Sequence, residues 1–182
     1  TGTLTSDEMR LKGVRLFPTD SKNEEDSSLV LPAEESLPWP VLRVMAACHS
    51  LALIGKARGS PVVGDPLEKT VLNHTGYELT GNSTVTSFDE SNPVNTVLIL
   101  HRFAFSSRLK RMTVLATEAN GKGAIWALTK GAPETIKELL SKESTPADYD
   151  DVSFHHMSRG RRVLALAYRE VGKTSDLQTL KD

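Results

Sequence analysis

Three apolar segments in the middle of the chain, joined by short connections, constrain the fold more than any other feature. They cover residues 96–105 (T-V-L-I-L-H-R-F-A-F), 110–117 (K-R-M-T-V-L-A-T) and 124–130. Their β-branched and apolar residues favour strands. Asn120-Gly121, between the second and third, is typical of a tight hairpin turn. Consecutive strands joined by hairpins predict an antiparallel meander.

The flanking segments complete an α+β domain. Further strands are expected at 9–17, where apolar and polar residues alternate, and at 162–171, and a strand and a turn are expected within 78–87. Helices are expected at 38–55, 65–76, 132–141 and 147–159, with a loop at 56–63. Asp65 and Pro66 suit the N-cap and first turn of the second helix, and Gly76 suits its C-terminal cap. The β-α-β alternation of a doubly wound sheet is missing. We therefore expect a mainly antiparallel twisted sheet flanked by helix pairs.

Composition excludes several classes of protein. The 182 residues carry a net charge of -1, which gives no global electrostatic case for nucleic acid. The longest apolar stretch, 41–54, contains Arg43, His49 and Ser50, so no membrane span is expected. Cys48 is the single cysteine, which excludes an internal disulfide, and its apolar surroundings predict a buried, inert thiol. The acidic, Ser-rich segment 20–36 is expected to be a mobile loop.

Familiar catalytic and phosphate-binding patterns are absent from the sequence. It contains neither G-x-x-x-x-G-K-[ST] nor G-x-G-x-x-G, and G-K-A-R-G at 55–59 is too short for a P-loop. The five histidines show no metal-ligand spacing with Cys48, and no metal site is expected in this chain. Any chemistry must therefore come from a less common arrangement.

Four short segments nevertheless suggest a ligand site. They are V-G-D-P-L-E-K (63–69), F-S-S-R-L-K-R-M (105–112), T-K-G-A-P-E-T (129–135) and G-R-R-V-L-A-L-A (160–167). Each has a structural alternative: a capped helix start, a strand running into a turn, a strand-to-helix junction and a core strand, respectively. Taken singly, each segment favours the structural interpretation.

Together, the residue types in these segments suit a nucleotide. Phe105 could stack on a base, and Lys110 and Lys130 offer charges for phosphate. Gly131 would let backbone approach a ligand closely. Arg162 could hold ribose or phosphate oxygens, and Glu68 could accept from an adenine exocyclic amine. The set indicates a nucleotide site without a P-loop.

The segments, in this order, resemble the motifs of P-type ATPases. T-G-T-L-T at 1–5 is similar to the end of D-K-T-G-T-L-T, the phosphorylation signature of that family, and the other four segments resemble its nucleotide-binding domain. The resemblance runs from Thr1 to about Val171 and is strongest to the fifth subfamily. One branch of that subfamily removes misinserted transmembrane helices from the endoplasmic reticulum membrane; the other exports polyamines. Lys110 and Glu68-Lys69 favour the first branch, because the second commonly has Gln at the position of Lys110.

The resemblance implies an ATP-binding role for part of a larger pump. Residues 1–9 would be a remnant of the phosphorylation motif and a hinge, 10–172 the nucleotide-binding domain, and 173–182 a tail or hinge to the phosphorylation domain. The implied ATP contacts are Glu68, Phe105, Lys110, Lys130, Gly131 and Arg162, while Thr1 and Thr3 would lie near phosphate and Mg²⁺. The reactive aspartate would precede Thr1 by two residues, so no catalytic residue and no independent hydrolysis are expected.

The implied partners are ATP and the phosphorylation and actuator domains, at the cytosolic face of the endoplasmic reticulum, without nucleic acid or direct membrane contact. A different class of function remains open from the residues alone. The chain could be a protein-interaction module with a decayed nucleotide site, docking through 20–36, although that segment has no aromatic anchor.

Overall fold

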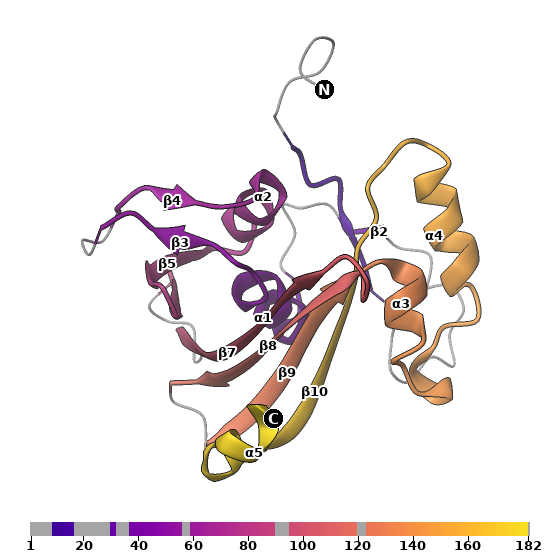
Figure 1. The fold of residues 1–182 in the computed structure, drawn as a ribbon. Coiled ribbons are helices and arrows are strands. Elements are labelled where there is room, and N and C mark those ends of the chain that lie inside the picture. Colours follow the sequence, from indigo (N-terminus) through magenta and orange to yellow (C-terminus); the bar gives the residue numbers. More distant parts are fainter. Residues whose placement is uncertain are drawn as a thin grey trace.

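The central element of the computed structural model is a six-stranded antiparallel sheet (Figure 1). The structure describes residues 9–16, 30–31, 37–55, 59–89, 95–119 and 123–181. The strand order is β10-β9-β8-β7-β6-β5. The strands are β5 (Tyr77–Gly81), β6 (Thr84–Ser87), β7 (Thr96–Ser106), β8 (Arg111–Glu118), β9 (Ala124–Gly131) and β10 (Ala165–Lys173). The α+β class and the antiparallel meander of β7, β8 and β9 are confirmed.

Helix α1 (Trp39–Ala47) covers one face of this sheet, with contacts to β7, β9 and β10. Pro38 precedes the helix and Pro40 lies in its first turn, where a missing N–H costs no hydrogen bond. The buried side of α1 joins the hydrophobic core of the sheet. That core includes Val44, Ala47, Cys48, Leu72, Val97, Met112, Val114 and Leu128. Cys48 is buried, as predicted, and burial raises the pKa of its thiol to about 12.

The first helix is shorter than the sequence pattern predicts. It ends at Ala47, and the chain continues through residues 48–51 into strand β3 (Ala52–Leu53). This strand pairs with β4 (Val62–Val63) in a separate two-stranded sheet. The predicted helix is therefore wrong beyond Ala47, and the predicted loop at 56–63 is wrong at Val62 and Val63. Side chains satisfy the backbone beyond Ala47: Glu68 accepts the Ser50 N–H, and His49 Nδ1 accepts the Leu51 N–H. These bonds offer the backbone an alternative to another helical turn.

The N-terminal strand is also shorter than expected. Within 9–17 only β1 (Val14–Arg15) is a strand among the described residues, and it pairs with β2 (Val30–Leu31). Residues 30–31 therefore belong to a strand, contrary to the prediction of a loop over 20–36. The pairing of β1 with β2 is the physical reason for this difference, because backbone N–H and C=O groups of the two segments bond each other. The other residues of 20–36 lie outside the described part of the chain, as does the predicted Asn120-Gly121 turn.

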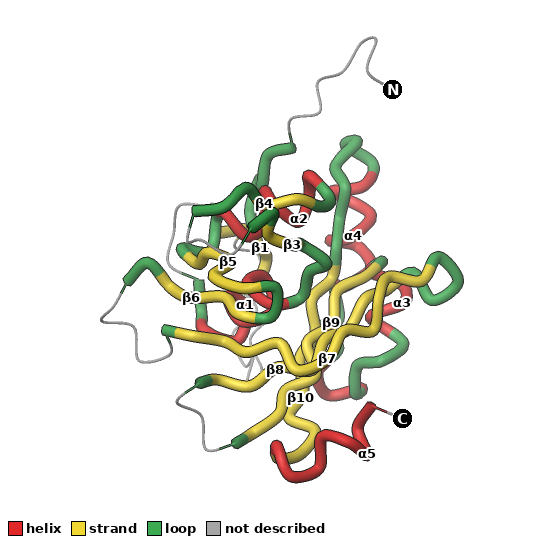
Figure 2. The backbone as a smooth tube through the Cα atoms, turned by 60° about the vertical axis from the view of Figure 1, so that its left-hand side comes forward, coloured by secondary structure: helices red, strands yellow, loops and turns green. Residues whose placement is uncertain are grey.

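Of three further helices, one lies above the left part of the sheet in Figure 1 and two lie to its right; Figure 2 shows the same elements turned by 60°. Helix α2 (Pro66–Asn73) packs on α1 and β5, while α3 (Pro133–Lys137) contacts β9, β10 and α4 (Tyr149–Met157). The predicted helices at 132–141 and 147–159 are thus present but shorter. The expected tail at 173–182 contains a 3₁₀ turn, Thr174–Asp176, and helix α5 (Leu177–Lys181).

No helix in the described ranges has the length and apolar character that a bilayer crossing requires.

Candidate nucleotide-binding site

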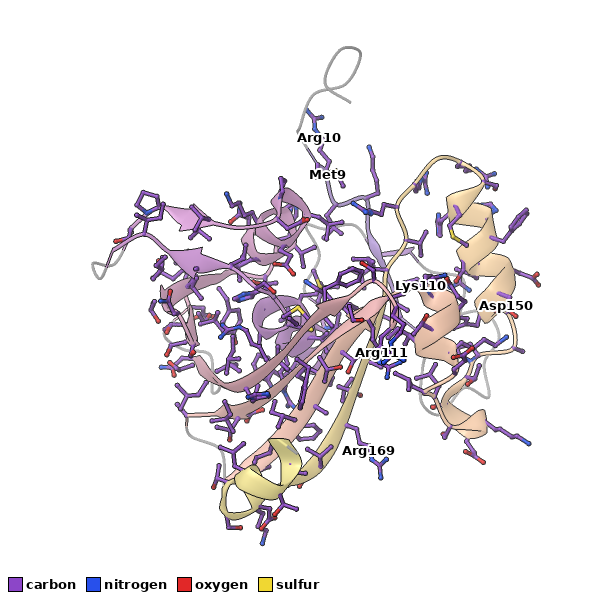
Figure 3. The ribbon with its side chains drawn as sticks, viewed as in Figure 1. Met9, Arg10, Lys110, Arg111, Asp150 and Arg169 are labelled. Carbon is purple, nitrogen blue, oxygen red and sulfur yellow. The ribbon has the colours of Figure 1, made fainter. Side chains whose placement is uncertain are left out.

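One end of the sheet gathers four of the predicted contact positions. The register places Ser106 of β7 opposite Arg111 of β8, Arg111 opposite Gly131 of β9, and Gly131 opposite Ala165 of β10. In an antiparallel sheet, the end of one strand meets the beginning of the next. Phe105, Lys110, Gly131 and Arg162 all lie at or within three residues of these paired positions. Figure 3 shows Lys110 and Arg111 at this end, beside α3 and away from α5.

Phe105 presents an aromatic ring to solvent at the end of β7. The pairing of β7 with β8 is irregular between Phe103 and Ser106, so Phe105 falls outside the regular ladder. Its side chain is 62% exposed. A large ring left accessible in this way can stack on another flat group without unpacking the core.

Lys110 occupies the last position of the turn between β7 and β8. Its φ angle is 46°, in the left-handed region that residues other than glycine rarely adopt. The Ala132 N–H donates to the Lys110 carbonyl at 3.0 Å, and the Lys110 ammonium lies 3.0 Å from Glu134 Oε1. Both side chains of this ion pair are more than half exposed. The turn is thus fixed by backbone contacts, while its ammonium faces solvent.

Gly131 has a packing reason to lack a side chain. A Cβ at this position would lie 2.6 Å from the Lys110 carbonyl oxygen and 2.7 Å from Arg111 Cβ. The close approach predicted for Gly131 is therefore made to the β7–β8 turn. Any approach to a ligand would be additional to this packing role. The glycine fixes where Lys110 sits relative to the end of β9.

Glu68 and Lys130 form a largely buried ion pair beneath this end of the sheet. Glu68 lies in the first turn of α2, which Asp65 caps by accepting the Leu67 N–H at 2.8 Å. The Lys130 ammonium lies 2.6 Å from Glu68 Oε1, and the side chains are 15% and 10% exposed, respectively. The Ser50 N–H donates to Glu68 Oε2 at 2.9 Å. Two residues predicted as separate ligand contacts are thus bonded to each other.

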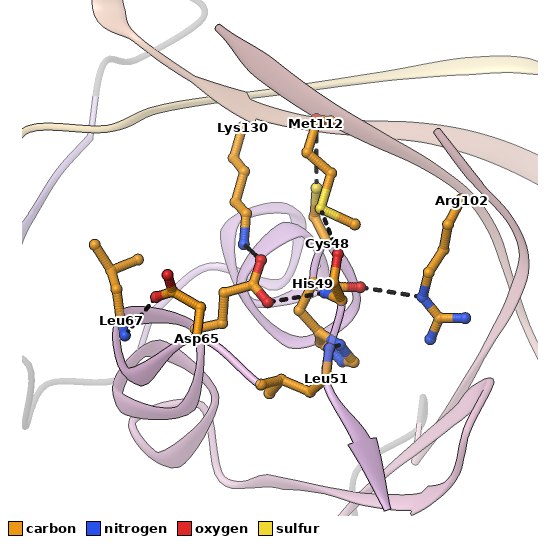
Figure 4. A network of polar contacts seen from close by, with 10 residues as sticks. Cys48, His49, Leu51, Asp65, Leu67, Arg102, Met112 and Lys130 are labelled. Atoms are coloured by element: carbon orange, nitrogen blue, oxygen red, sulfur yellow. Dashed lines mark hydrogen bonds and ion pairs between the residues drawn. The ribbon is translucent and has the colours of Figure 1, made fainter. Parts of the chain in front are cut away.

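Two residues that the sequence patterns did not single out complete the network in Figure 4. His49 is buried, and its pKa is lowered to about 3 by burial and by the charges of Arg102 and Lys130. Arg102 of β7 donates from Nε to the His49 carbonyl at 3.1 Å. An arginine inside the apolar segment 96–105 was the available signal, because a charged group in a half-buried strand needs partners.

Arg162 lies in the connection before β10 and is exposed. It is three residues ahead of Ala165, which pairs with Gly131, so the backbone separation is at most about 10 Å. This places Arg162 on the same end of the sheet as Phe105 and Lys110. Thr1 and Thr3, predicted near phosphate and Mg²⁺, lie outside the described residues.

Comparison with known proteins identifies the family. No family model matches the chain. The chain is 36% identical over 189 residues to a probable cation-transporting ATPase 13A4 of Gallus gallus, covering 96% of the chain and 15% of that protein. It is 36% identical to the probable manganese-transporting ATPase PDR2 of Arabidopsis thaliana, covering 94% and 13%, respectively. It is 34% identical to the endoplasmic reticulum transmembrane helix translocase of Saccharomyces cerevisiae, covering 96% and 13%. The chain belongs to the P-type ATPase family.

These relatives confirm the resemblance that the sequence motifs predicted, including its placement in the fifth subfamily. The matched regions cover nearly the whole chain, so the similarity extends well beyond the short motifs. The chain spans 13–15% of the length of these three relatives.

Proposed function

We propose that residues 10–172 form the nucleotide-binding domain of a fifth-subfamily P-type ATPase and hold ATP at the end of the sheet where β7, β8, β9 and β10 meet. The observation that carries this proposal is the gathering of Phe105, Lys110, Gly131 and Arg162 at that end, although 57 residues separate the first from the last in sequence. Family membership supplies independent support.

The exposed and buried residues would serve different purposes. Adenine would stack on Phe105, an interaction of about 1–3 kcal/mol. The exposed ion pair of Lys110 with Glu134 contributes little to stability, so the Lys110 ammonium can exchange Glu134 for a phosphate oxygen at small cost. The Lys130 ammonium would stay paired with Glu68, because separating a largely buried ion pair leaves an uncompensated charge. Its remaining N–H donors would be offered to a phosphate oxygen. Arg162 would reach the phosphates from the connection before β10.

In the intact pump this domain would bind and orient ATP for transfer of the γ-phosphoryl group to the aspartate of the phosphorylation domain. Mg²⁺, when bound, would neutralise charge on the phosphates. Thr1 and Thr3 would lie beside that transfer. The domain's own contribution is binding and positioning, with the phosphorylation and actuator domains as partners.

The helix-removing branch of the subfamily is favoured by Lys110 and Glu68-Lys69. We therefore propose that ATP binding here powers removal of misinserted transmembrane helices at the cytosolic face of the endoplasmic reticulum membrane. Similarity to the yeast helix translocase supports this proposal.

The polyamine-exporting branch is a second candidate, because polyamines are cations and the chain is 36% identical to the probable cation-transporting ATPase 13A4 of Gallus gallus, a value similar to the 34% identity with the yeast translocase. Stimulation of ATP hydrolysis of the full-length protein separates the two branches. We expect stimulation by an apolar helical peptide; stimulation by spermine would favour the second candidate.

The ATP site itself is tested by Phe105→Ala with Phe154→Ala as a matched control. Both rings are highly exposed, at 62% and 70%, but Phe154 lies on α4. We expect the wild-type chain to bind ATP with a Kd on the order of 1 mM. Phe105→Ala should remove most of the binding without lowering the unfolding midpoint, and Phe154→Ala should leave it unchanged. Equal ATP affinity in the two variants, measured by NMR titration, would contradict the proposed site.

A further inference from the structure

We propose that Arg102 is a positioning residue for ATP binding, which acts through the His49–Ser50 peptide group and Glu68 on the Lys130 ammonium. The inference rests on the proposed function of this site. Arg102 lies on β7, and its guanidinium points toward the segment that follows α1 (Figure 4).

One peptide group is held from both sides. Its carbonyl, from His49, accepts a hydrogen bond from Arg102 Nε at 3.1 Å, and its N–H, from Ser50, donates to Glu68 Oε2 at 2.9 Å. Because a trans peptide group is planar, its C=O and N–H point in opposite directions and turn together. Fixing the His49 carbonyl therefore fixes the direction in which the Ser50 N–H donates to Glu68.

The contacts form a chain of alternating charge. The Arg102 guanidinium faces the negative end of the peptide dipole, the positive end faces the Glu68 carboxylate, and Glu68 Oε1 accepts from the Lys130 ammonium at 2.6 Å. Hydrogen bonds linked in this way polarise one another in a low-dielectric interior. Burial lowers the pKa of Arg102, whereas the Glu68 carboxylate raises it, so the two charges stabilise each other across the peptide.

The held segment is packed by its side chains, but its backbone follows no regular element: Cys48, His49 and Leu51 are buried, and Cys48 Sγ and Ser50 Oγ donate to Met112. Cys48 to Leu51 lies between α1 and β3 and belongs to neither. The Leu51 N–H is taken up by His49 Nδ1 at 3.1 Å rather than by a ladder or a helix. A peptide group in such a segment can rotate at lower cost than one inside a helix or strand. The donor that Arg102 supplies to the His49 carbonyl therefore helps to fix the orientation of this peptide group.

Arg102 also fixes this segment to a third part of the chain. Its guanidinium donates to the Asn82 carbonyl at 2.5 Å and to Ser83 Oγ at 3.4 Å, in the turn between β5 and β6. The Asn82 side chain in turn accepts the Leu53 N–H at 3.0 Å. The planar guanidinium, with several donors in fixed directions, suits this role better than a single ammonium.

The expected effect of losing Arg102 is a displaced Lys130 ammonium. Without the guanidinium the His49–Ser50 peptide is free to turn, Glu68 loses a donor, and the ion pair with Lys130 shifts. A small misplacement of a charged group can weaken its interaction with phosphate substantially. Arg102→Met should therefore weaken ATP binding about tenfold, the change expected from loss of one hydrogen bond to a charged group.

The test combines ATP titration with a double-mutant cycle. We expect Arg102→Met to weaken ATP binding in the wild-type background but to add nothing in a Glu68→Gln background, because the effect passes through Glu68. Arg169→Met is the matched control, since Arg169 is exposed on β10 and points away from the sheet (Figure 3). It should leave affinity unchanged. Additive losses in the cycle would overturn the positioning role.

A spectroscopic readout separates positioning from general loss of stability. In Arg102→Met without ATP, the Ser50 amide proton should move upfield as its hydrogen bond to the carboxylate is lost. Arg102→Lys, which keeps a charged donor for the His49 carbonyl but loses the fixed donors to Asn82 and Ser83, should restore part of that shift and part of the affinity. An unchanged Ser50 signal in Arg102→Met would contradict the inference.

The outcomes also separate this inference from the proposed function. Absence of ATP binding by the wild-type chain would overturn both. Wild-type binding with equal binding by Arg102→Met would overturn the positioning role alone. Should Arg102→Met fail to fold, Arg102→Gln tests the same point, because it keeps a polar side chain but removes the charged donor to His49.

Discussion

At the scale of single residues, the predicted nucleotide contacts divide by burial. Phe105, Lys110 and Arg162 are exposed, whereas Glu68 and Lys130 are largely buried and paired. The exposed residues can change partner when a ligand arrives, since water already screens their charges. The buried pair of Glu68 and Lys130 would keep its geometry when a ligand binds. The sequence suggested these residues one by one but could not show that Glu68 and Lys130 face each other from α2 and β9.

His49 makes the stability of the domain depend on pH. In the folded chain its pKa is lowered from 6.5 to about 3, chiefly by burial, so the imidazole stays neutral in the fold while the unfolded chain takes up a proton below about pH 6.5. Stability contributed by the neutral ring is therefore present above pH 6.5. It is lost as the pH falls toward 3, at about 1.4 kcal/mol per pH unit from this group.

The measurement is the free energy of unfolding in urea at pH 7, 6 and 5. His49→Asn keeps an acceptor for the Leu51 N–H and removes the titrating ring, so the decrease in stability between pH 6.5 and 5 should become shallower. His155→Asn, on exposed α4, should keep the wild-type slope. A wild-type slope in His49→Asn would show that another group is responsible.

At the scale of elements, the junction of the β7–β8 turn with the end of β9 sets the shape of the proposed site. The Lys110 carbonyl receives the Ala132 N–H, and Gly131 lies directly against the turn. Lys110 holds a left-handed backbone conformation there without being a glycine. A residue kept in a sparsely populated conformation is often found at a binding site, which agrees with the proposed role of this turn.

Gly131→Ala should push the β7–β8 turn away from the end of β9. The new Cβ would meet backbone atoms of Lys110 and Arg111 at 3.0 Å or less, which cannot be relieved by a side-chain rotation. We expect a loss of about 1–3 kcal/mol in unfolding free energy together with weaker ATP binding. Gly81→Ala is the control, because a Cβ in this strand would have no contact closer than 3.7 Å. Equal stability of the two variants, measured by urea unfolding, would contradict the packing role of Gly131.

The early end of α1 shows where sequence patterns fail at this scale. Apolar residues from Val41 to Leu53 fit a helical period, and the sequence contains no proline or glycine to stop it before Gly55. The helix ends at Ala47 because Glu68, from another helix, and Arg102, from a strand, bond the backbone of 49–50. Such tertiary partners override local propensity and cannot be read from a window of sequence.

At the scale of the whole molecule, local patterns predicted the sheet and the order of its motifs. Alternating and apolar runs with hairpin turns predicted β7, β8 and β9, and a capped start predicted α2. The meeting of Phe105, Lys110, Gly131 and Arg162 at one end of the sheet follows from antiparallel order. The support network of His49 and Arg102 depends on contacts 53 residues apart in sequence, so no local pattern could predict it.

Binding of ATP at the end of the sheet formed by β7, β8, β9 and β10 can be measured directly by an NMR titration of the isotopically labelled 182-residue chain with ATP, followed by mapping of the amide shifts. We predict saturable changes around Phe105, Lys110 and Gly131, with a Kd on the order of 1 mM. Unchanged signals at these residues at ATP concentrations well above that value, or changes confined to another part of the domain, would show that ATP does not bind at this end of the sheet.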